Sequence, residues 1–173
     1  MARSPVPPAH SLSLAGYYRL LHENLNFRRL WLAQLISGLG DWFYSVAIYG
    51  LLLELTGSAE AVAWAVVLQI LPFFLASPTA GAVNDRVSRR RVMIVTDVLR
   101  SLVVLGMLFI ERERQIGLLY LLLGVEVVAA AFFESARTAA IPNVVDRRRI
   151  STANAVSSTT WSVTVTAGGG LGG

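Results

Sequence analysis

Residues 81–100, GAVNDRVSRRRVMIVTDVLR, place four arginines between two long apolar runs. These arginines are Arg86, Arg89, Arg90 and Arg91, and Asp97 and Arg100 follow inside the second run. A helix needs about 20 apolar residues to cross a bilayer, and arginines gathered in a short connecting loop fix the orientation of the neighbouring helices. The pattern therefore predicts two membrane helices joined by a basic turn.

The composition supports a membrane protein over a soluble one. Of the 173 residues, 54% are hydrophobic and only 15% are charged, against roughly 25% charged in soluble domains. The net charge of +4 does not indicate nucleic-acid binding, because the arginines lie between the apolar runs. The chain has no cysteine and only two histidines, and no nucleophile–base or metal-ligand spacing is present. We therefore expect neither an enzyme nor a bound cofactor.

Five apolar runs follow the N-terminal segment, at about residues 30–55, 59–83, 92–110, 116–133 and 150–173. The first four have the length of a complete span, whereas the fifth is weakly apolar and rich in Ser, Thr and Gly. Only helices satisfy all their own backbone hydrogen bonds in lipid, so these runs predict an all-α, polytopic membrane helix bundle. The bundle would have about four complete transmembrane helices and a truncated fifth. Before it, residues 1–29 form a tail that fits either a short surface helix or a partly ordered segment.

The orientation follows from the distribution of the arginines. One side of the bundle collects twelve, and the opposite side has only Arg112 and Arg114, which Glu111 and Glu113 offset. The twelve are Arg3, Arg19, Arg28, Arg29, Arg86, Arg89, Arg90, Arg91, Arg137, Arg147, Arg148 and Arg149. Loops on the cytoplasmic side carry the excess of positive charge, so the N-terminus is predicted to be cytoplasmic.

Two acidic residues fall near the middle of predicted spans, Asp41 in the first and Glu126 in the fourth. Each costs about 2.5–3.5 kcal/mol at the bilayer centre on insertion scales, so such residues often mark ion or substrate paths. Helical spacing puts Gln34, Gly38, Asp41 and Ser45 on one face. We consider Asp41, Glu126, Gln34 and Gln69 candidate proton or substrate residues. The alternative for Asp41 is an interhelical hydrogen bond, for example to Gln69.

Two further pairs of opposite charge stand three residues apart, Asp97 with Arg100 and Glu134 with Arg137. Residues at this spacing are neighbours on a helix surface, so each pair can neutralise itself and allow insertion. A structural role is therefore the favoured interpretation for both pairs. Pro72 is expected to kink the second span, because it removes one backbone hydrogen bond.

At this point the sequence resembles a known family. The pattern G-x-x-x-D-R-x-x-R-R, at Gly81, Asp85, Arg86, Arg89 and Arg90, is similar to the signature loop of the major facilitator superfamily. Residues 132–156, FFESARTAAIPNVVDRRRISTANAV, resemble the bacterial macrolide-efflux and enterobactin-exporter branch. The ending AGGGLGG resembles the antiporter motif of the fifth helix, with Gly169 in place of its proline. Close helix packing there would use Gly168, Gly169, Gly172 and Gly173.

The resemblance implies a transporter of the inner or plasma membrane that works by alternating access. Its substrates would be amphipathic small molecules of the drug or siderophore type, exported in exchange for protons. Asp85 and the arginines of the basic turn would form a gate. Residues 30–173 would be an incomplete N-terminal transmembrane half, whose partners are the lipid bilayer, substrate, protons and a C-terminal half. The alternative is a non-transporting membrane fragment or one half of a split transporter.

Overall fold

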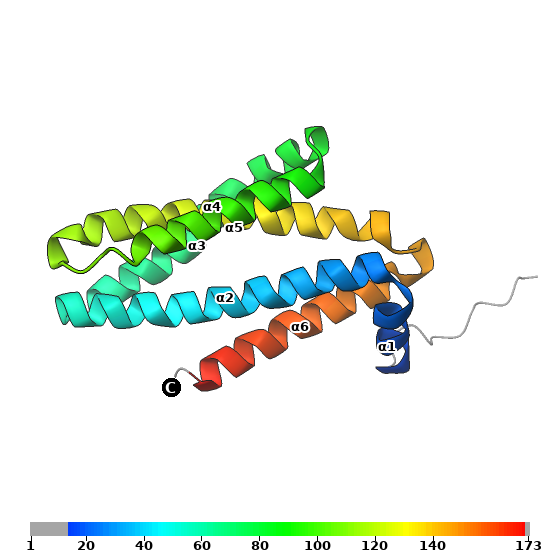
Figure 1. The fold of residues 1–173 in the computed structure, drawn as a ribbon, viewed down its shortest axis with the longest axis horizontal. Helices are drawn as coiled ribbons and strands as arrows, with labels where there is room; N and C mark the ends of the chain where they lie inside the picture. The colour runs from blue at the N-terminus through cyan, green and yellow to red at the C-terminus, as the bar shows by residue number, and fades with distance from the viewer. Residues whose placement is uncertain (1–13, 172–173) are drawn as a thin grey trace, which may run out of the picture. The chain divides into compact units, whose positions relative to one another are not determined.

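The computed structural model describes residues 14–171, and every regular element in this range is a helix. In chain order these are α1 (Leu14–Glu23), α2 (Leu25–Thr56), α3 (Ala59–Arg86), α4 (Arg89–Met107), η2 (Glu113–Gln115), α5 (Ile116–Val144), η3 (Arg147–Arg149) and α6 (Ile150–Leu171) (Figure 1). The chain forms two compact units, one of Gly40–Ala140 and one of Met1–Leu39 with Ile141–Gly173. The predicted all-α membrane bundle is thus confirmed.

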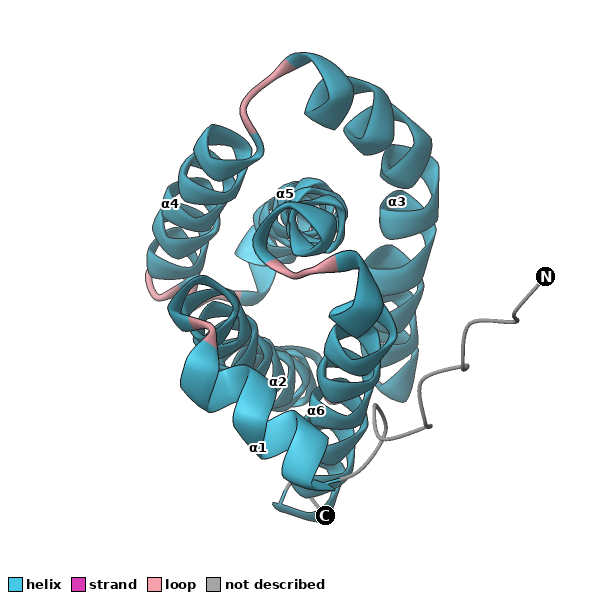
Figure 2. Cartoon of the chain, turned by 90° about the vertical axis from the view of Figure 1, so that its right-hand side faces the viewer, coloured by secondary structure: helices cyan, strands magenta, loops and turns pink. Residues whose placement is uncertain are grey.

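The unit Gly40–Ala140 contains α3, α4 and most of α2 and α5. Within it α5 lies between α3 and α4, as the end-on view shows (Figure 2). The tight turn from α2 to α3 is possible because Gly57 adopts a φ of 63°, a conformation that glycine accepts without strain. The side chain of Ser58 then caps α3 by accepting a hydrogen bond from the backbone N–H of Glu60. This hairpin brings Leu52 and Ala65 together with Leu119 of α5 in a fully buried core.

The second unit packs α1 and the start of α2 against α6. Its core consists of buried apolar residues from these helices and from the end of α5, namely Leu20, Phe27, Ile141, Val145, Ala153 and Val156. Asn24 separates α1 from α2 and holds the junction, because its side chain accepts from the N–H of Phe27 and donates to the carbonyl of Val144. Further along α2, Trp31 donates to the hydroxyl of Thr160 at 2.7 Å.

Three segments of the described chain are long and apolar enough to cross a membrane: Leu25–Thr56, Ala59–Arg86 and Glu113–Val144. They correspond to the first, second and fourth predicted spans. The third, α4, is not among them, because five of its 19 residues are charged. Arg100 and Asp97 of α4 are nevertheless paired with other side chains, so composition alone overstates the polarity that this helix presents to lipid.

Candidate functional site

The candidate site is centred on Arg100 of α4, whose guanidinium group contacts three carboxylates. Its Nε donates to Oε1 of Glu126 at 2.8 Å. One terminal nitrogen donates to the carboxylate of Asp41, and the other lies 3.8 Å from Oδ1 of Asp97. The cluster therefore joins α2, α4 and α5 within the unit Gly40–Ala140. We call Asp41, Asp97, Arg100 and Glu126 the charge cluster.

The helices position these groups through ordinary spacing and packing. Asp97 and Arg100 are three residues apart, so they meet on one face of α4. Phe133 of α5 adds an aromatic ring at 5.9 Å from the guanidinium carbon, which is within cation–π range. A planar guanidinium with five N–H donors can serve several carboxylates at once, which a lysine ammonium would do less well.

The members of the charge cluster differ in their access to the surface of the bundle. The side chains of Arg100 and Glu126 are 9% and 6% exposed, whereas those of Asp41 and Asp97 are 51% and 50% exposed. The three carboxylates outnumber the single guanidinium, so the fully ionised cluster carries excess negative charge. Asp41 and Asp97 are thus the members whose carboxylates lie at the surface of the described helices.

Three further polar side chains lie on α2 and α3, namely Tyr44, Tyr49 and Gln69. The hydroxyl of Tyr49 donates to Oε1 of Gln69 at 3.0 Å. Tyr44 carries a further hydroxyl on α2, three residues from Asp41, at a spacing that makes the two side chains neighbours on the helix. Within the described part of the chain, this hydroxyl and Nε2 of Gln69 are buried and have no hydrogen-bond partner. Buried polar groups normally have partners, so these two atoms mark places where a ligand or water could bind.

The predicted stripe on α2 divides between two sets of contacts. Gln34 donates to the carbonyl of Ser157, and a side chain on Gly38 would approach Thr164 of α6. Asp41 instead contacts Arg100, and Ser45 donates to the carbonyl of Asp41 on its own helix. The hydrogen bond that we considered between Asp41 and Gln69 does not form. The carboxylate of Asp41 accepts a hydrogen bond from Arg100 instead, and Nε2 of Gln69 has no partner among the described residues.

The loop of the basic turn is only Val87 and Ser88, since α3 continues through Arg86 and α4 begins at Arg89, so the arginines of the basic turn lie in the adjoining ends of these two helices. Asp85 therefore lies in the last turn of α3, where it is exposed. It does not cap α4, because the N-cap residue is Ser88 and makes no side-chain cap bond. Arg89 donates to the carbonyl of Ala139 on α5 at 2.5 Å, and Gly81 has open space around its Cα. Arg86 and Arg90 are exposed.

Glu134 and Arg137 form a two-bond ion pair inside α5. The fourth apolar run was predicted to end near residue 133, which would place Arg137 in the following connection. α5 extends instead to Val144, so Arg137 is a buried residue of this helix. Gly168 and Gly169 lie in α6. Gly172 and Gly173 fall outside the described residues.

The sequence pattern identified each residue of the charge cluster, but it did not predict that Arg100 contacts all three carboxylates. We had paired Arg100 with Asp97 alone, although Asp41 and Glu126 are its hydrogen-bonded partners. Charge balance could have revealed this arrangement. Arg100 is the one arginine inside a predicted span, and Asp41 and Glu126 are the mid-span acids that needed compensation.

A bundle of long apolar helices with its buried charges paired inside defines a polytopic membrane protein. Residues 20–173 match the family described as transmembrane secretion effector, and the chain belongs to this family of the major facilitator superfamily. The predicted superfamily is thereby confirmed. The family consists of transporters and not of enzymes, which also confirms that prediction.

Several curated proteins are similar to this chain. Macrolide efflux protein A of Streptococcus pyogenes is 27% identical over 128 residues, which are 73% of this chain and 32% of that protein. An MFS-type transporter of Mycobacterium tuberculosis is 32% identical over 162 residues, which are 90% of this chain and 34% of that protein. The chain thus spans about a third of the length of the curated relatives it matches. No solved structure matches the chain significantly.

Proposed function

We propose that this chain forms the first part of a proton-coupled transporter that exports amphipathic small molecules. The observation that carries the proposal is the charge cluster, in which one buried arginine is shared by three carboxylates on three helices. The name of Macrolide efflux protein A, a relative at 27% identity, supports an efflux direction and a drug-like substrate class. Because the matched segment covers only about a third of each relative, the proposed activity is that of a full-length transporter containing this chain.

Asp41 is the residue we propose to exchange a proton for substrate. It combines a direct contact with Arg100 and a half-exposed carboxylate, whereas Glu126 is held in the interior. Protonation of Asp41 would remove one of the charges that hold Arg100 toward α2. A cationic substrate would compete with that proton for the same carboxylate. Each ligand would then favour a different arrangement of the helices, which is the minimum requirement for exchange.

The neighbouring polar residues supply candidate substrate contacts. Gln69 has a buried donor without a partner in the described structure, and it lies one hydrogen bond from Tyr49. Gln34 already donates to α6, so we propose that it positions α2 and contacts substrate only when that bond opens. Glu126 would hold Arg100 in place while Asp41 changes its protonation state.

The basic turn is proposed to act as the cytoplasmic gate. The bond from Arg89 to the carbonyl of Ala139 ties the beginning of α4 to α5. Asp85, Arg86 and Arg90 are exposed and free to contact another segment when the transporter changes state, and Gly81 leaves room for a close approach. The pairs Asp97–Arg100 and Glu134–Arg137 would keep charged helices stable in the bilayer.

The proposed setting is the inner or plasma membrane, crossed several times, with the N-terminus in the cytoplasm. Residues 1–29 would form the cytoplasmic tail. Residues 30–173 would belong to the N-terminal transmembrane half, with a C-terminal half as partner in the complete transporter. The glycines at 168, 169, 172 and 173 would allow another helix to approach α6 closely.

The test is Asp41→Asn in a full-length transporter that contains this chain, assayed in inverted membrane vesicles. The amide keeps the size of the side chain and can still meet Arg100, but it cannot exchange a proton. Drug uptake driven by a pH gradient should fall to background, while exchange of drug for drug without a gradient should persist. Glu54→Gln is the matched control, because Glu54 is an exposed acid of α2 outside the charge cluster. Gradient-driven uptake that survives Asp41→Asn would refute the proposed role.

A further inference from the structure

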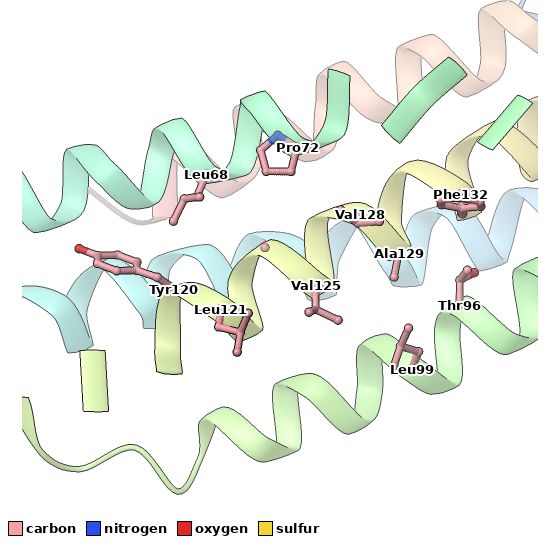
Figure 3. A pocket seen from close by; sticks show the side chains of 11 residues that line it. Leu68, Pro72, Thr96, Leu99, Tyr120, Leu121, Val125, Val128, Ala129 and Phe132 are labelled. Atoms are coloured by element: carbon pink, nitrogen blue, oxygen red, sulfur yellow. The ribbon is translucent and has the colours of Figure 1, made fainter. Parts of the chain in front are cut away.

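A groove on the unit Gly40–Ala140 is lined by none of the residues of the charge cluster. Its floor is α5, and its walls are α3 and α4, with a volume of about 710 Å³. Figure 3 shows Leu68 and Pro72 of α3 on one side of α5 and Thr96 and Leu99 of α4 on the other. The volume is within the roughly 300–1,000 Å³ of small-molecule sites.

The side chains that line the groove offer a ligand no free hydrogen-bond donor. It contains two hydroxyl groups, and both already donate to backbone carbonyls of the protein. Thr96 donates to the carbonyl of Val92 at 2.8 Å, and Tyr120 donates to the carbonyl of Ala61 at 2.8 Å. Sites for drug-like molecules normally carry a few polar groups that fix the ligand's orientation. A hydrocarbon chain requires none, so the lining favours an acyl chain.

The two walls of the groove converge on the basic turn. Thr96 lies five residues from Arg91, which is about 8 Å along the axis of α4. Arg86, Arg90 and Arg91 are exposed at this end. Arg89 lies on the same face of α4 as Thr96, two turns nearer the start of the helix. It donates to the carbonyl of Ala139 and so joins α4 to α5 at this end. The apolar groove thus ends about 8 Å along α4 from a group of exposed positive charges, none of which lines it.

We propose that the groove binds one acyl chain of an anionic phospholipid, whose phosphate contacts the arginines of the basic turn. α3 and α5 are long and apolar enough to cross the membrane, and the proposal places the groove against the hydrocarbon layer. A lipid lying along α5 would place its headgroup at the polar end of α4 and its chain over Gly124. Basic pockets between membrane helices recognise anionic headgroups in this way. The bound lipid would tie α3, α4 and α5 together beside the proposed gate.

Gly124 provides a direct test of the acyl-chain site. It lines the groove, and a Cβ built on it meets nothing within 4 Å, so a larger side chain can fill the groove without touching backbone. Gly124→Leu should remove most of the bound phosphatidylglycerol measured by native mass spectrometry of the purified chain. Gly50→Leu is the matched control, because Gly50 is also unobstructed but lies on α2 outside the groove. Equal lipid retention in both variants would overturn the proposal.

Arginine substitutions test the headgroup contact separately. Arg90→Gln combined with Arg91→Gln should weaken phosphatidylglycerol binding about fivefold for each arginine removed, with phosphatidylcholine binding unchanged. Arg112→Gln combined with Arg114→Gln is the control, since these residues lie at the other end of α4. Equal binding of phosphatidylglycerol and phosphatidylcholine by the unmodified chain would overturn the proposal. Displacement of the lipid by a macrolide at equimolar concentration would also overturn it, because the occupant would then be a transported compound.

If Gly124→Leu proves unstable, Gly124→Ala gives a milder version of the same test. One methyl group enters open space in this variant, so folding should be unaffected and lipid binding should fall only slightly. A graded loss of lipid from Gly to Ala to Leu is the expected result. A loss of lipid in Gly124→Ala as large as in Gly124→Leu would contradict the filling of a groove.

Discussion

Arg100 is a buried cation between largely apolar helices, and it is tolerated because carboxylates surround it. Breaking a buried ion pair by removing one partner costs about 3–5 kcal/mol, since the other charge is left without compensation. Glu126 is the partner that would suffer most, because its side chain is only 6% exposed. Asp41 and Asp97 are half exposed and can be partly solvated. The stability of the charge cluster therefore depends mainly on the Arg100–Glu126 contact.

We predict that Arg100→Gln destabilises the chain by about 3–5 kcal/mol, measured by denaturant unfolding in detergent. Adding Glu126→Gln should restore much of this loss, because the double variant no longer buries an uncompensated carboxylate at that position. Arg19→Gln is the control, since its ion pair with Glu23 is exposed and should contribute about 1 kcal/mol or less. A double variant less stable than Arg100→Gln alone would contradict this account of the pair.

At the residue scale, the sequence indicated which side chains matter but not how they are combined. Asp41, Glu126 and Arg100 each stand out because ionisable residues are rare inside membrane spans. Their common contact depends on the packing of α2, α4 and α5, which no local pattern encodes. The unpaired hydroxyl of Tyr44 could not be predicted for the same reason.

The helices of the second unit are joined by side-chain hydrogen bonds as well as by apolar packing. Trp31 of α2 donates to Thr160 of α6 at 2.7 Å, and Gln34 donates to the carbonyl of Ser157 at 3.0 Å. The hydroxyl of Thr160 also donates to the carbonyl of Val156 on its own helix. The weakly apolar α6 thus satisfies its hydroxyl groups partly through its own backbone and partly through α2.

Trp31→Phe should lower the free energy of unfolding modestly, because it removes the hydrogen bond to Thr160 and keeps most of the aromatic ring. Interhelical hydrogen bonds in membrane proteins average about 0.6 kcal/mol and reach about 1.7 kcal/mol. Unfolding in detergent would measure the change. Trp161→Phe serves as the control, because Trp161 is on α6 and is 66% exposed. A larger effect at Trp161 than at Trp31 would argue against the hydrogen bond.

The turn between α3 and α4 gives a functional prediction at the same scale. Asp85 is exposed, and no ion pair of its carboxylate is seen among residues 14–171. Asp85→Asn should therefore leave membrane insertion and unfolding of the chain unchanged. In a full-length transporter it should reduce transport by about fivefold or more, if Asp85 biases the gate between two states. Asp146→Asn, before η3, is the control, and wild-type transport by Asp85→Asn would reduce the turn to a topology signal.

The elements themselves were largely predictable, because long apolar runs specify membrane helices. Their ends were less so. The polar stretch at Glu134–Arg137 suggested that the fourth span ends near Phe133, but α5 continues to Val144. The two residues neutralise each other through two hydrogen bonds on one helix face, so their charges do not end the helix. Similarly, α4 has too many charged residues to be recognised as a membrane span from its composition. That Arg100 is paired with Glu126 of α5 can be seen only in the three-dimensional structure.

At the scale of the whole molecule, the arginines divide unequally between the two ends of the helices. Arg86, Arg90 and Arg91 are exposed near the turn from α3 to α4, whereas the turn from α4 to α5 carries Arg112 and Arg114 beside Glu111 and Glu113. The inequality predicts that the first turn stays in the cytoplasm and the second is external. The orientation of the chain in the membrane thus depends on exposed arginines that contribute little to its packing.

The absence of cysteine from the sequence makes this orientation directly measurable. Single cysteines can be introduced as Ser88→Cys in the first turn and Glu113→Cys in η2, where both native residues are exposed. A membrane-impermeant maleimide added to intact cells should label Glu113→Cys and leave Ser88→Cys unlabelled. Both should react after the membrane is made permeable, which controls for accessibility of the thiol. Labelling of Ser88→Cys alone in intact cells would reverse the topology. It would also place the arginines of the basic turn on the external side, where they could not form a cytoplasmic gate.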